Sequence, residues 1–246
     1  MIRRRPSTSV KILIISDLHA NLEAIEALPK EFDQLWVLGD LVNYGPDPAA
    51  AIRYVRQHAG MIVRGNHDHA VGFGEDPRCS ARFLKMAEET CGYTRSVLED
   101  DELRYLRGLP LKAACEVAGT GFLLCHAAPS DPLYEYRAAE SDRWSADPAG
   151  WSGVVLAGHT HLPFQRTYAG KTIVNPGSVG QPKHGRAEAC YAIWQDGKIT
   201  LGAVAYDVER TVEKLWRLSL SAEVFDDLAF VLRHGNAPPT SADSSD

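Results

Sequence analysis

A chain of 246 residues with 45% hydrophobic and 24% charged residues has the composition of a globular protein. Because no linker-like segment interrupts the middle of the sequence, we favour one domain over two. The formal net charge of -6 argues against a stable nucleic-acid partner, and no apolar run has the length of a membrane span or the form of a signal peptide. Five scattered cysteines, an odd number, predict reduced thiols and therefore a cytoplasmic location.

The first predicted element is a buried strand over residues 11–15, where a lysine precedes an unbroken Ile/Leu run. Asp17 and His19 follow this strand. In extended chain, side chains two residues apart point the same way, so we expect a carboxylate and an imidazole aimed at one point. Residues 22–28 have helical apolar spacing, with Asn21 as the expected N-cap. A strand, a polar loop and a helix form the unit whose loop carries ligands in α/β proteins.

Two more predicted strands end in polar residues at the same relative place. The strand over residues 34–38 ends in Gly39 and Asp40, and the strand over 61–63 is followed by Asn66 and His67. A single Asp after Gly is more often a turn or a cap. Because the arrangement recurs three times, and because such strand ends line one crevice of an open sheet, we favour a functional site.

The next part of the chain offers less chemistry. Helices are predicted over residues 48–58, 80–87 and 100–109. A hairpin over residues 111–125 follows, and its second strand ends in His126. We expect Cys125 to be a buried small apolar residue and not a nucleophile, because strand alternation places it opposite His126.

The polar segment 130–151 has the composition of a functional loop or lid, and surface irregularity explains it equally well. A strand over 153–157 then ends in His159 and His161, which repeat the two-residue spacing found after the first strand.

The remaining sequence predicts two hairpins, two helices and a tail. They cover residues 164–174, 189–205 with a turn at Asp196-Gly197, 211–218, 222–234 and 235–246. The last stretch is rich in Pro, Ser and Asp, so we expect one domain over residues 1–234 and a flexible C-terminal tail over 235–246.

Seven candidate metal ligands stand at strand ends: Asp17, His19, Asp40, Asn66, His126, His159 and His161. Four imidazoles, two carboxylates and an amide are too many for one tetrahedral zinc, but they suit two divalent ions with one carboxylate bridging. Two such ions about 3.5–4 Å apart clamp a phosphoryl group and lower the pKa of a shared water. Two dications outweigh two carboxylates, so the site stays cationic and attracts an anionic substrate.

The order of these motifs resembles the calcineurin-like metallophosphoesterase family. The motifs are Asp17-Leu18-His19, Gly39-Asp40, Gly65-Asn66-His67-Asp68, Cys125-His126 and Gly158-His159-Thr160-His161. Each is weak alone, but five in order are highly specific. The stretches at 43–48 and 175–182 are similar to a small bacterial phosphodiesterase-type branch of the family.

The resemblance implies a four-layer α/β/β/α sandwich of two mixed sheets flanked by helices, with the metal site at the C-terminal ends of the strands. It assigns one metal ion to Asp17, His19 and His161. It assigns a second ion to Asn66, His126 and His159, with Asp40 bridging the two. His67 is then the general acid that protonates the leaving oxygen. Manganese is the expected metal, and iron, zinc, nickel or cobalt also fit such ligands.

The chain departs from the protein Ser/Thr phosphatase branch, which has an Asp-Arg pair where this chain has Asn43 and Tyr44. In that branch the Asp orients the catalytic histidine and the Arg grips the phosphate. Their loss argues against a protein phosphatase. It leaves Asn43 as the hydrogen-bond partner expected for His67.

We therefore predict a metal-dependent phosphoesterase that hydrolyses a phosphodiester, a phosphomonoester or a nucleotide phosphoanhydride of a small substrate. The candidate substrate contacts are Asn43, Tyr134 and Arg137, with Arg143 in the same lid and Asn175 and Ser178 on the opposite wall. The alternative is a non-catalytic scaffold of the same fold, like the retromer subunit of this superfamily. A complete ligand set together with His67 disfavours that alternative.

Overall fold

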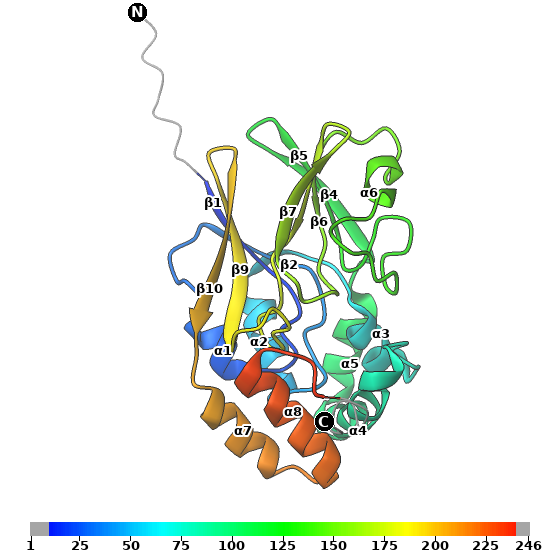
Figure 1. Cartoon of the computed structure of the whole chain (residues 1–246), viewed down its shortest axis with the longest axis vertical. Helices are drawn as coiled ribbons and strands as arrows, with labels where there is room; N and C mark the ends of the chain where they lie inside the picture. Colours follow the sequence, from blue (N-terminus) through cyan, green and yellow to red (C-terminus); the bar gives the residue numbers. More distant parts are fainter. Residues whose placement is uncertain (1–9, 240–246) are drawn as a thin grey trace, which may run out of the picture.

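Two five-stranded mixed sheets pack face to face in the computed structural model, which describes residues 10–239 (Figure 1). In the first sheet the strand order is β10-β9-β1-β2-β3, and in the second it is β4-β5-β6-β8-β7. The strands are β1 Lys11–Ile15, β2 Gln34–Val37, β3 Ala59–Ile62, β4 Lys112–Val117, β5 Thr120–Cys125, β6 Gly153–Leu156, β7 Phe164–Tyr168, β8 Lys171–Asn175, β9 Glu188–Gln195 and β10 Lys198–Ala205.

The central strands of each sheet are parallel, and this orientation brings their C-terminal ends to one edge. In the first sheet β1 pairs in parallel with β2, and β2 with β3. In the second sheet β5 pairs in parallel with β6, and β6 with β8. The antiparallel hairpins predicted over 111–125, 164–174 and 189–205 are confirmed at the sheet margins.

The core between the sheets is made by alternate residues of each strand. Ile12, Ile14 and Trp36 of the first sheet pack against Phe122 and Leu124 of the second. The ring of Trp36 meets that of Phe122 edge to face at 5.0 Å between centroids. Aromatic pairs of this kind add to the hydrophobic burial that holds the sheets together.

Helices cover the outer face of the first sheet and the lower end of the molecule in Figure 1. They are α1 Leu22–Ala27, α2 Pro48–His58, α3 Asn66–Phe73, α4 Ala81–Val97, α5 Asp100–Gly108, α7 Val208–Trp216 and α8 Ala222–His234. Asn21 caps α1 as expected, since its side chain accepts a hydrogen bond from the Ala24 N–H at 3.1 Å.

The outer face of the second sheet has a thinner cover. Trp144 of the short helix α6 Arg143–Ala146 packs there against Val155 and Ile173. The rest of the cover is irregular chain from the segment 130–151, the predicted loop or lid. The expected α/β/β/α order of layers is confirmed, with one outer layer built mainly from a loop.

Helix α3 was not expected, because its first residues are polar and resemble a loop. It begins where the Asp68 carboxylate accepts the Gly65 N–H at 3.0 Å, and it packs on α5. Helix α4 is also longer than predicted and runs on to Val97. Tertiary contacts stabilise both helices beyond their local propensity.

The beginning of the predicted C-terminal tail is held by the fold. Gly235 ends α8 in a left-handed conformation, and its carbonyl accepts a hydrogen bond from the Gly185 N–H at 2.8 Å. The rest of the predicted tail, residues 240–246, lies outside the described residues, as do residues 1–9. Within residues 10–239 no helix is long and apolar enough to cross a membrane. All five cysteines are free thiols.

Candidate metal centre

All seven predicted ligands converge where the two sheets meet. Those from the first sheet follow β1, β2 and β3, and they are Asp17, His19, Asp40 and Asn66. Those from the second sheet follow β5 and β6, and they are His126, His159 and His161. Because the parallel strands end at one edge, residues more than 140 positions apart become neighbours.

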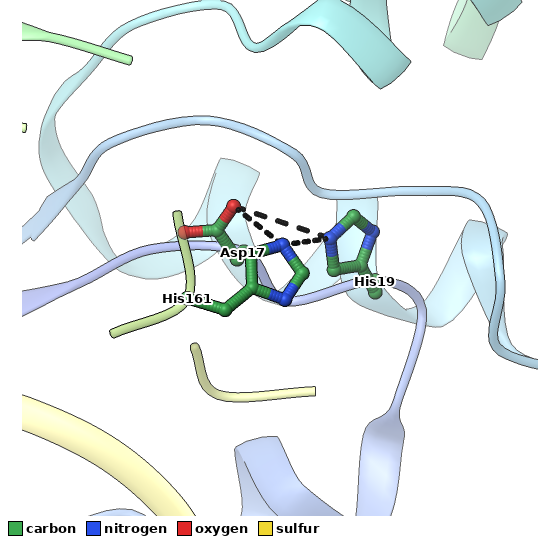
Figure 2. Close-up of side chains that lie close together, drawn as sticks. All are labelled: Asp17, His19 and His161. Carbon is green, nitrogen blue, oxygen red and sulfur yellow. Dashed lines mark hydrogen bonds and ion pairs between the residues drawn. The ribbon is translucent and has the colours of Figure 1, made fainter. Parts of the chain in front are cut away.

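The first group consists of Asp17, His19 and His161, whose side chains point toward one another (Figure 2). The Nε2 atoms of the two imidazoles are 3.2 Å apart, and Nε2 of His161 lies 3.3 Å from Asp17 Oδ1. All three residues are buried. Asp17 Oδ1 has no hydrogen-bond partner among the described residues, although it is out of contact with solvent.

The second group consists of Asp40, His126 and His159, with Asn66 beside them. Nε2 of His126 lies 3.2 Å from Asp40 Oδ2 and 3.0 Å from Asn66 Oδ1. Asn66 Oδ1 is in turn 3.1 Å from His159 Nδ1. Asp40 Oδ2 also lies 3.8 Å from His19 Nε2, so this carboxylate faces both groups.

Backbone carbonyls fix which imidazole nitrogens face the centre. Nδ1 of His19, His126 and His161 donates to a main-chain oxygen at 3.3, 2.8 and 2.6 Å respectively, which leaves each Nε2 as a lone-pair acceptor. The Asn66 amide is oriented in the same way, because its Nδ2 donates to the Pro77 carbonyl at 2.7 Å. The groups therefore present acceptor atoms to one another.

Acceptors at such distances repel one another unless a proton or a cation lies between them. Burial alone would raise the pKa of Asp17, but His161 beside it brings that pKa below its ordinary value. Burial lowers the pKa of His126, yet the Asp40 carboxylate overrides this and raises it to about 9. A proton thus occupies this cluster of acceptors when no metal does, and metal binding would release it. The donor set fits two divalent ions.

The backbone that carries the ligands is not extended, so one prediction is wrong. Asp17, His19, Asp40, His159 and His161 all have positive φ, between 43° and 65°. The side chains converge through left-handed turns and not through strand alternation. One consequence is that His159 and His161 belong to different groups, although the two-residue spacing alone predicted that they point the same way. Non-glycine residues in this region are strained, and strain of this kind gathers at functional sites.

Two glycines leave room for the carboxylates. A Cβ built on Gly65 would overlap the Asp40 carboxylate, and one built on Gly158 would overlap the Ser16 hydroxyl beside Asp17. In the Gly65-Asn66 and Gly158-His159 motifs, the close approach of a neighbouring side chain therefore requires the glycine itself, in addition to any role of the candidate ligand that follows it.

Asp68 belongs to one of the five motifs but received no role from the sequence. It is fully buried, and it accepts hydrogen bonds from the backbone N–H groups of Asp40 at 2.8 Å and Leu41 at 2.7 Å. Its carboxylate thus holds the loop that presents Asp40. Burial and the nearby Asp40 charge raise the pKa of Asp68 to about 7.

His67 lies beside the metal groups, in the pocket, and is paired as expected with Asn43. Nδ2 of Asn43 donates to His67 Nδ1 at 2.8 Å, while Asn43 Oδ1 accepts from the Tyr44 N–H at 3.1 Å. Burial lowers the pKa of His67 to about 4, so the ring is neutral and carries its proton on Nε2. Asn43 therefore positions His67 and does not face the pocket itself.

A pocket of about 630 Å³ opens above the metal groups. Its lining includes Tyr134, as predicted. It also includes residues that the sequence analysis did not single out as substrate contacts: Tyr44, Arg78, Phe83, Tyr136 and Lys183. No local signal marks the last of these as functional, since it stands in a Gly/Pro-rich loop whose position depends on the fold.

Arg137 lies outside this pocket, contrary to the lid expectation. Its guanidinium is almost fully buried and is paired with Glu135 at 2.7 Å and Asp147 at 2.9 Å. With both carboxylates as partners it holds the segment together, so we do not propose it as a substrate contact. Arg143 likewise pairs with Glu135 at 2.8 Å.

The two residues expected on the opposite wall also have structural positions. Asn175 donates through Nδ2 to the Gly158 carbonyl at 2.7 Å, and the Ser178 hydroxyl donates to the Asp17 carbonyl at 2.9 Å. Both are fully buried behind the ligand loops. They fix the turns that carry Asp17 and His159.

Comparison with known proteins agrees with this geometry. A protein of Methanocaldococcus jannaschii without an assigned function is 30% identical over 83% of this chain and 91% of its own. A symmetrical bis(5'-nucleosyl)-tetraphosphatase of Legionella pneumophila is 32% identical over 61% of this chain, which spans about half (51%) of that enzyme. The crystal structure of a metallophosphoesterase from Sphaerobacter thermophilus is 30% identical, with a TM-score of 0.75 over 89% of this chain and 99% of that one.

The family model of the calcineurin-like phosphoesterase superfamily domain matches residues 10–196. This range contains both sheets except β10, and it contains every candidate ligand. The chain therefore belongs to the calcineurin-like phosphoesterase superfamily.

Proposed function

We propose that this protein hydrolyses a phosphoester or phosphoanhydride bond of a small phosphorylated substrate, with two divalent metal ions as cofactors. The observation that carries the proposal is the pair of adjacent ligand groups at the floor of an open pocket, with Asp40 facing both. Mononuclear sites need neither the second group nor a shared carboxylate.

Asp17, His19 and His161 would hold one ion, and Asn66, His126 and His159 the other, with Asp40 between them. When bound, such a pair polarises a phosphoryl group and activates water at neutral pH. Mixed nitrogen and oxygen donors suit manganese, and also iron, zinc, nickel or cobalt. Two dications exceed the charge of Asp17 and Asp40, so the pocket floor attracts an anionic phosphate.

His67 is the proton donor in this proposal. Its neutral ring carries the proton on Nε2, because the Asn43 amide donates to Nδ1. Its Nε2–H at the edge of the pocket would hydrogen-bond the leaving oxygen of a bound phosphate, and the negative charge of that phosphate would raise the pKa of the ring. The ring would then take up a second proton from solvent, give its Nε2 proton to the leaving oxygen and return to the neutral form. The ring is held by an edge contact with His19 and a tilted contact with Tyr44, at 5.2 and 4.7 Å between centroids respectively.

A nucleotide is the substrate that we favour. The pocket is far larger than one phosphate needs, and the aromatic rings of Tyr134 and Tyr136 line it. The relative from Legionella pneumophila is named for dinucleoside tetraphosphates, which makes these compounds the first candidates. Assembly of the complete ligand set around His67 favours an enzyme over a scaffold.

The test is hydrolysis of bis-p-nitrophenyl phosphate and of a nucleotide and dinucleoside polyphosphate panel, with each divalent ion added to metal-free protein. We expect turnover with manganese, its loss with a chelator, and two metal ions per chain by elemental analysis. The proposal would be wrong if the folded protein bound no metal, or if it cleaved none of these substrates with any of the ions.

A further inference from the structure

Two cations in the pocket have no part in the metal centre. Lys183 follows the loop that accepts the His161 Nδ1–H, and Arg78 follows Pro77, whose carbonyl accepts the Asn66 amide. Both side chains line the pocket above the metal groups. A hydrogen bond to a metal ligand thus anchors the segment that carries each cation.

Each cation is seated on an aromatic ring. Nζ of Lys183 lies 4.1 Å from the centroid of Phe83, and the guanidinium carbon of Arg78 lies 4.5 Å from that of Tyr134. Contacts at this distance hold a cation in place without neutralising it. The rings therefore position two charges and leave their N–H donors for another partner.

Neither cation has a carboxylate within ion-pair distance in the part of the chain that the structure describes. The contrast with Arg137, which has two such partners, is clear. Half-buried Lys183 is the more telling case, because charged groups away from water are normally paired. The anionic partner that Lys183 and Arg78 lack therefore has to come from a bound ligand.

The metal centre does not supply that anion. The carboxylates of Asp17 and Asp40 support the charge on Lys183, while burial lowers its pKa to about 8. Two bound dications would cancel those carboxylates and would repel the ammonium. In the metal-loaded protein a bound phosphate would supply the negative charge that no carboxylate among the described residues brings within ion-pair distance of Lys183.

The backbone at Arg78 has a constrained form. Its φ is 53°, a left-handed value that is uncommon for arginine, and its N–H donates to Asp76 Oδ1 at 2.7 Å. This turn directs the side chain over Tyr134 instead of leaving it free in solvent.

We propose that Lys183 and Arg78 form a second anion subsite, which binds a phosphate of the substrate beyond the one held at the metal centre. The inference rests on the proposed function and narrows it. The pocket then prefers substrates with at least two linked phosphates, such as nucleoside polyphosphates, over monoesters and simple diesters. Charge-assisted hydrogen bonds from both cations carry this preference.

The test compares AMP with α,β-methylene-ADP, a non-hydrolysable ligand that differs by one phosphate, in calorimetric titrations of manganese-loaded protein. Wild-type protein should bind the analogue about tenfold or more tightly than AMP, the usual worth of one charge-assisted hydrogen bond. Lys183→Met and Arg78→Met keep an unbranched side chain on the ring and should each reduce that ratio to a few-fold. Lys198→Met on β10 and Arg53→Met on α2, both exposed elsewhere, should leave it unchanged.

Equal affinity of wild-type protein for the two ligands would overturn the subsite. So would a loss in Lys183→Met and Arg78→Met that is the same for both ligands. Calorimetry needs no turnover, so the result is separate from the proposed activity. A protein inactive on every ester that still binds the analogue in a manner dependent on Lys183 would overturn the proposed function and support the subsite.

Discussion

At the scale of single residues, His67 and Asp40 are neighbours with separate roles. The backbone N–H of His67 donates to Asp40 Oδ1 at 2.9 Å, while Oδ2 of the same carboxylate faces the imidazoles of both groups. His67 itself belongs to neither group of candidate metal ligands. Substitution should therefore separate proton donation from metal binding.

His67→Ala should keep both metal ions and lower the rate by roughly 10²–10⁴-fold for a substrate with a poor leaving group, because a positioned general acid is lost. The loss should shrink for p-nitrophenolate, since that oxygen needs less protonation. Rates across a series of aryl esters, with metal content measured on the same samples, check this expectation.

Asp40→Asn is the contrasting variant. Removal of the shared charge should reduce metal occupancy and lower the rate for all leaving groups alike. If His67→Ala loses a metal ion, or if its loss of rate is the same for leaving groups of different pKa, His67 is not the general acid.

Lys183 predicts a pH dependence of ligand binding. Burial brings its pKa down to about 8, so the ammonium is charged below that pH and loses its proton above it. About half of the Lys183 side chains are uncharged at a pH equal to that pKa, so affinity for α,β-methylene-ADP should fall progressively as the pH rises from 7 to 9. Titrations at pH 7 and 9 check the direction. The fall should persist in Arg78→Met and vanish in Lys183→Met, and a fall of the same size in both would assign it to another group.

At the scale of elements, the turn between β3 and α3 depends on one glycine. A Cβ on Gly65 would overlap the Asp40 carboxylate. The two loops cannot move apart freely, because the Asp68 carboxylate accepts hydrogen bonds from the backbone N–H groups of both Asp40 and Gly65. Gly65→Ala should therefore displace Asp40 and reduce metal stoichiometry, with the sheets intact by circular dichroism. Elemental analysis of the purified variant measures the effect.

Gly92→Ala is the matched control. Gly92 lies in α4 with open space around it, so the added methyl should leave metal binding unchanged and stabilise the helix by about 0.5–1 kcal/mol. Normal metal content in Gly65→Ala would show that Asp40 can move away from the added methyl group without any loss of metal binding, which would contradict this prediction.

At the scale of the whole molecule, each ligand group joins the two sheets. Asp17 and His19 of the first sheet meet His161 of the second, and Asp40 meets His126 and His159. An ion bound in either group would therefore link strands that otherwise touch through the hydrophobic core between the sheets. Folding and metal binding should be strongly coupled.

Removal of metal should accordingly lower the melting temperature. A ligand at a hundredfold excess over its dissociation constant adds about 2.7 kcal/mol, which for a domain of this size is a shift of about 5–10 °C. Thermal unfolding with manganese and with a chelator measures the shift. The difference in melting temperature between these two conditions should be much smaller in Asp40→Asn. The same melting temperature under both conditions would argue against metal as a link between the sheets.

The sequence by itself predicted the strands and most of the helices, and it singled out the seven candidate ligands. Apolar runs that end in Asp, Asn or His are local patterns, and so is the Asp196-Gly197 turn that joins β9 to β10. Parallel strands place their ends at one edge, so the convergence of the seven ligands follows from the fold class alone. The fold class itself came from the order of five motifs.

The grouping of the candidate ligands was already implied by the family resemblance, but only the tertiary structure decided which backbone turns produce that grouping and what surrounds the ligands. Left-handed turns send His159 and His161 to different groups, and a local pattern of spacing does not contain those dihedral angles. Arg137 was expected to bind substrate, but long-range packing placed it between two carboxylates. Lys183 carried no local signal, yet the same packing places its charge in the pocket on the ring of Phe83, without a carboxylate partner among the described residues. The physical reason is that the availability of a charge depends on its neighbours in space, which lie far apart in the chain.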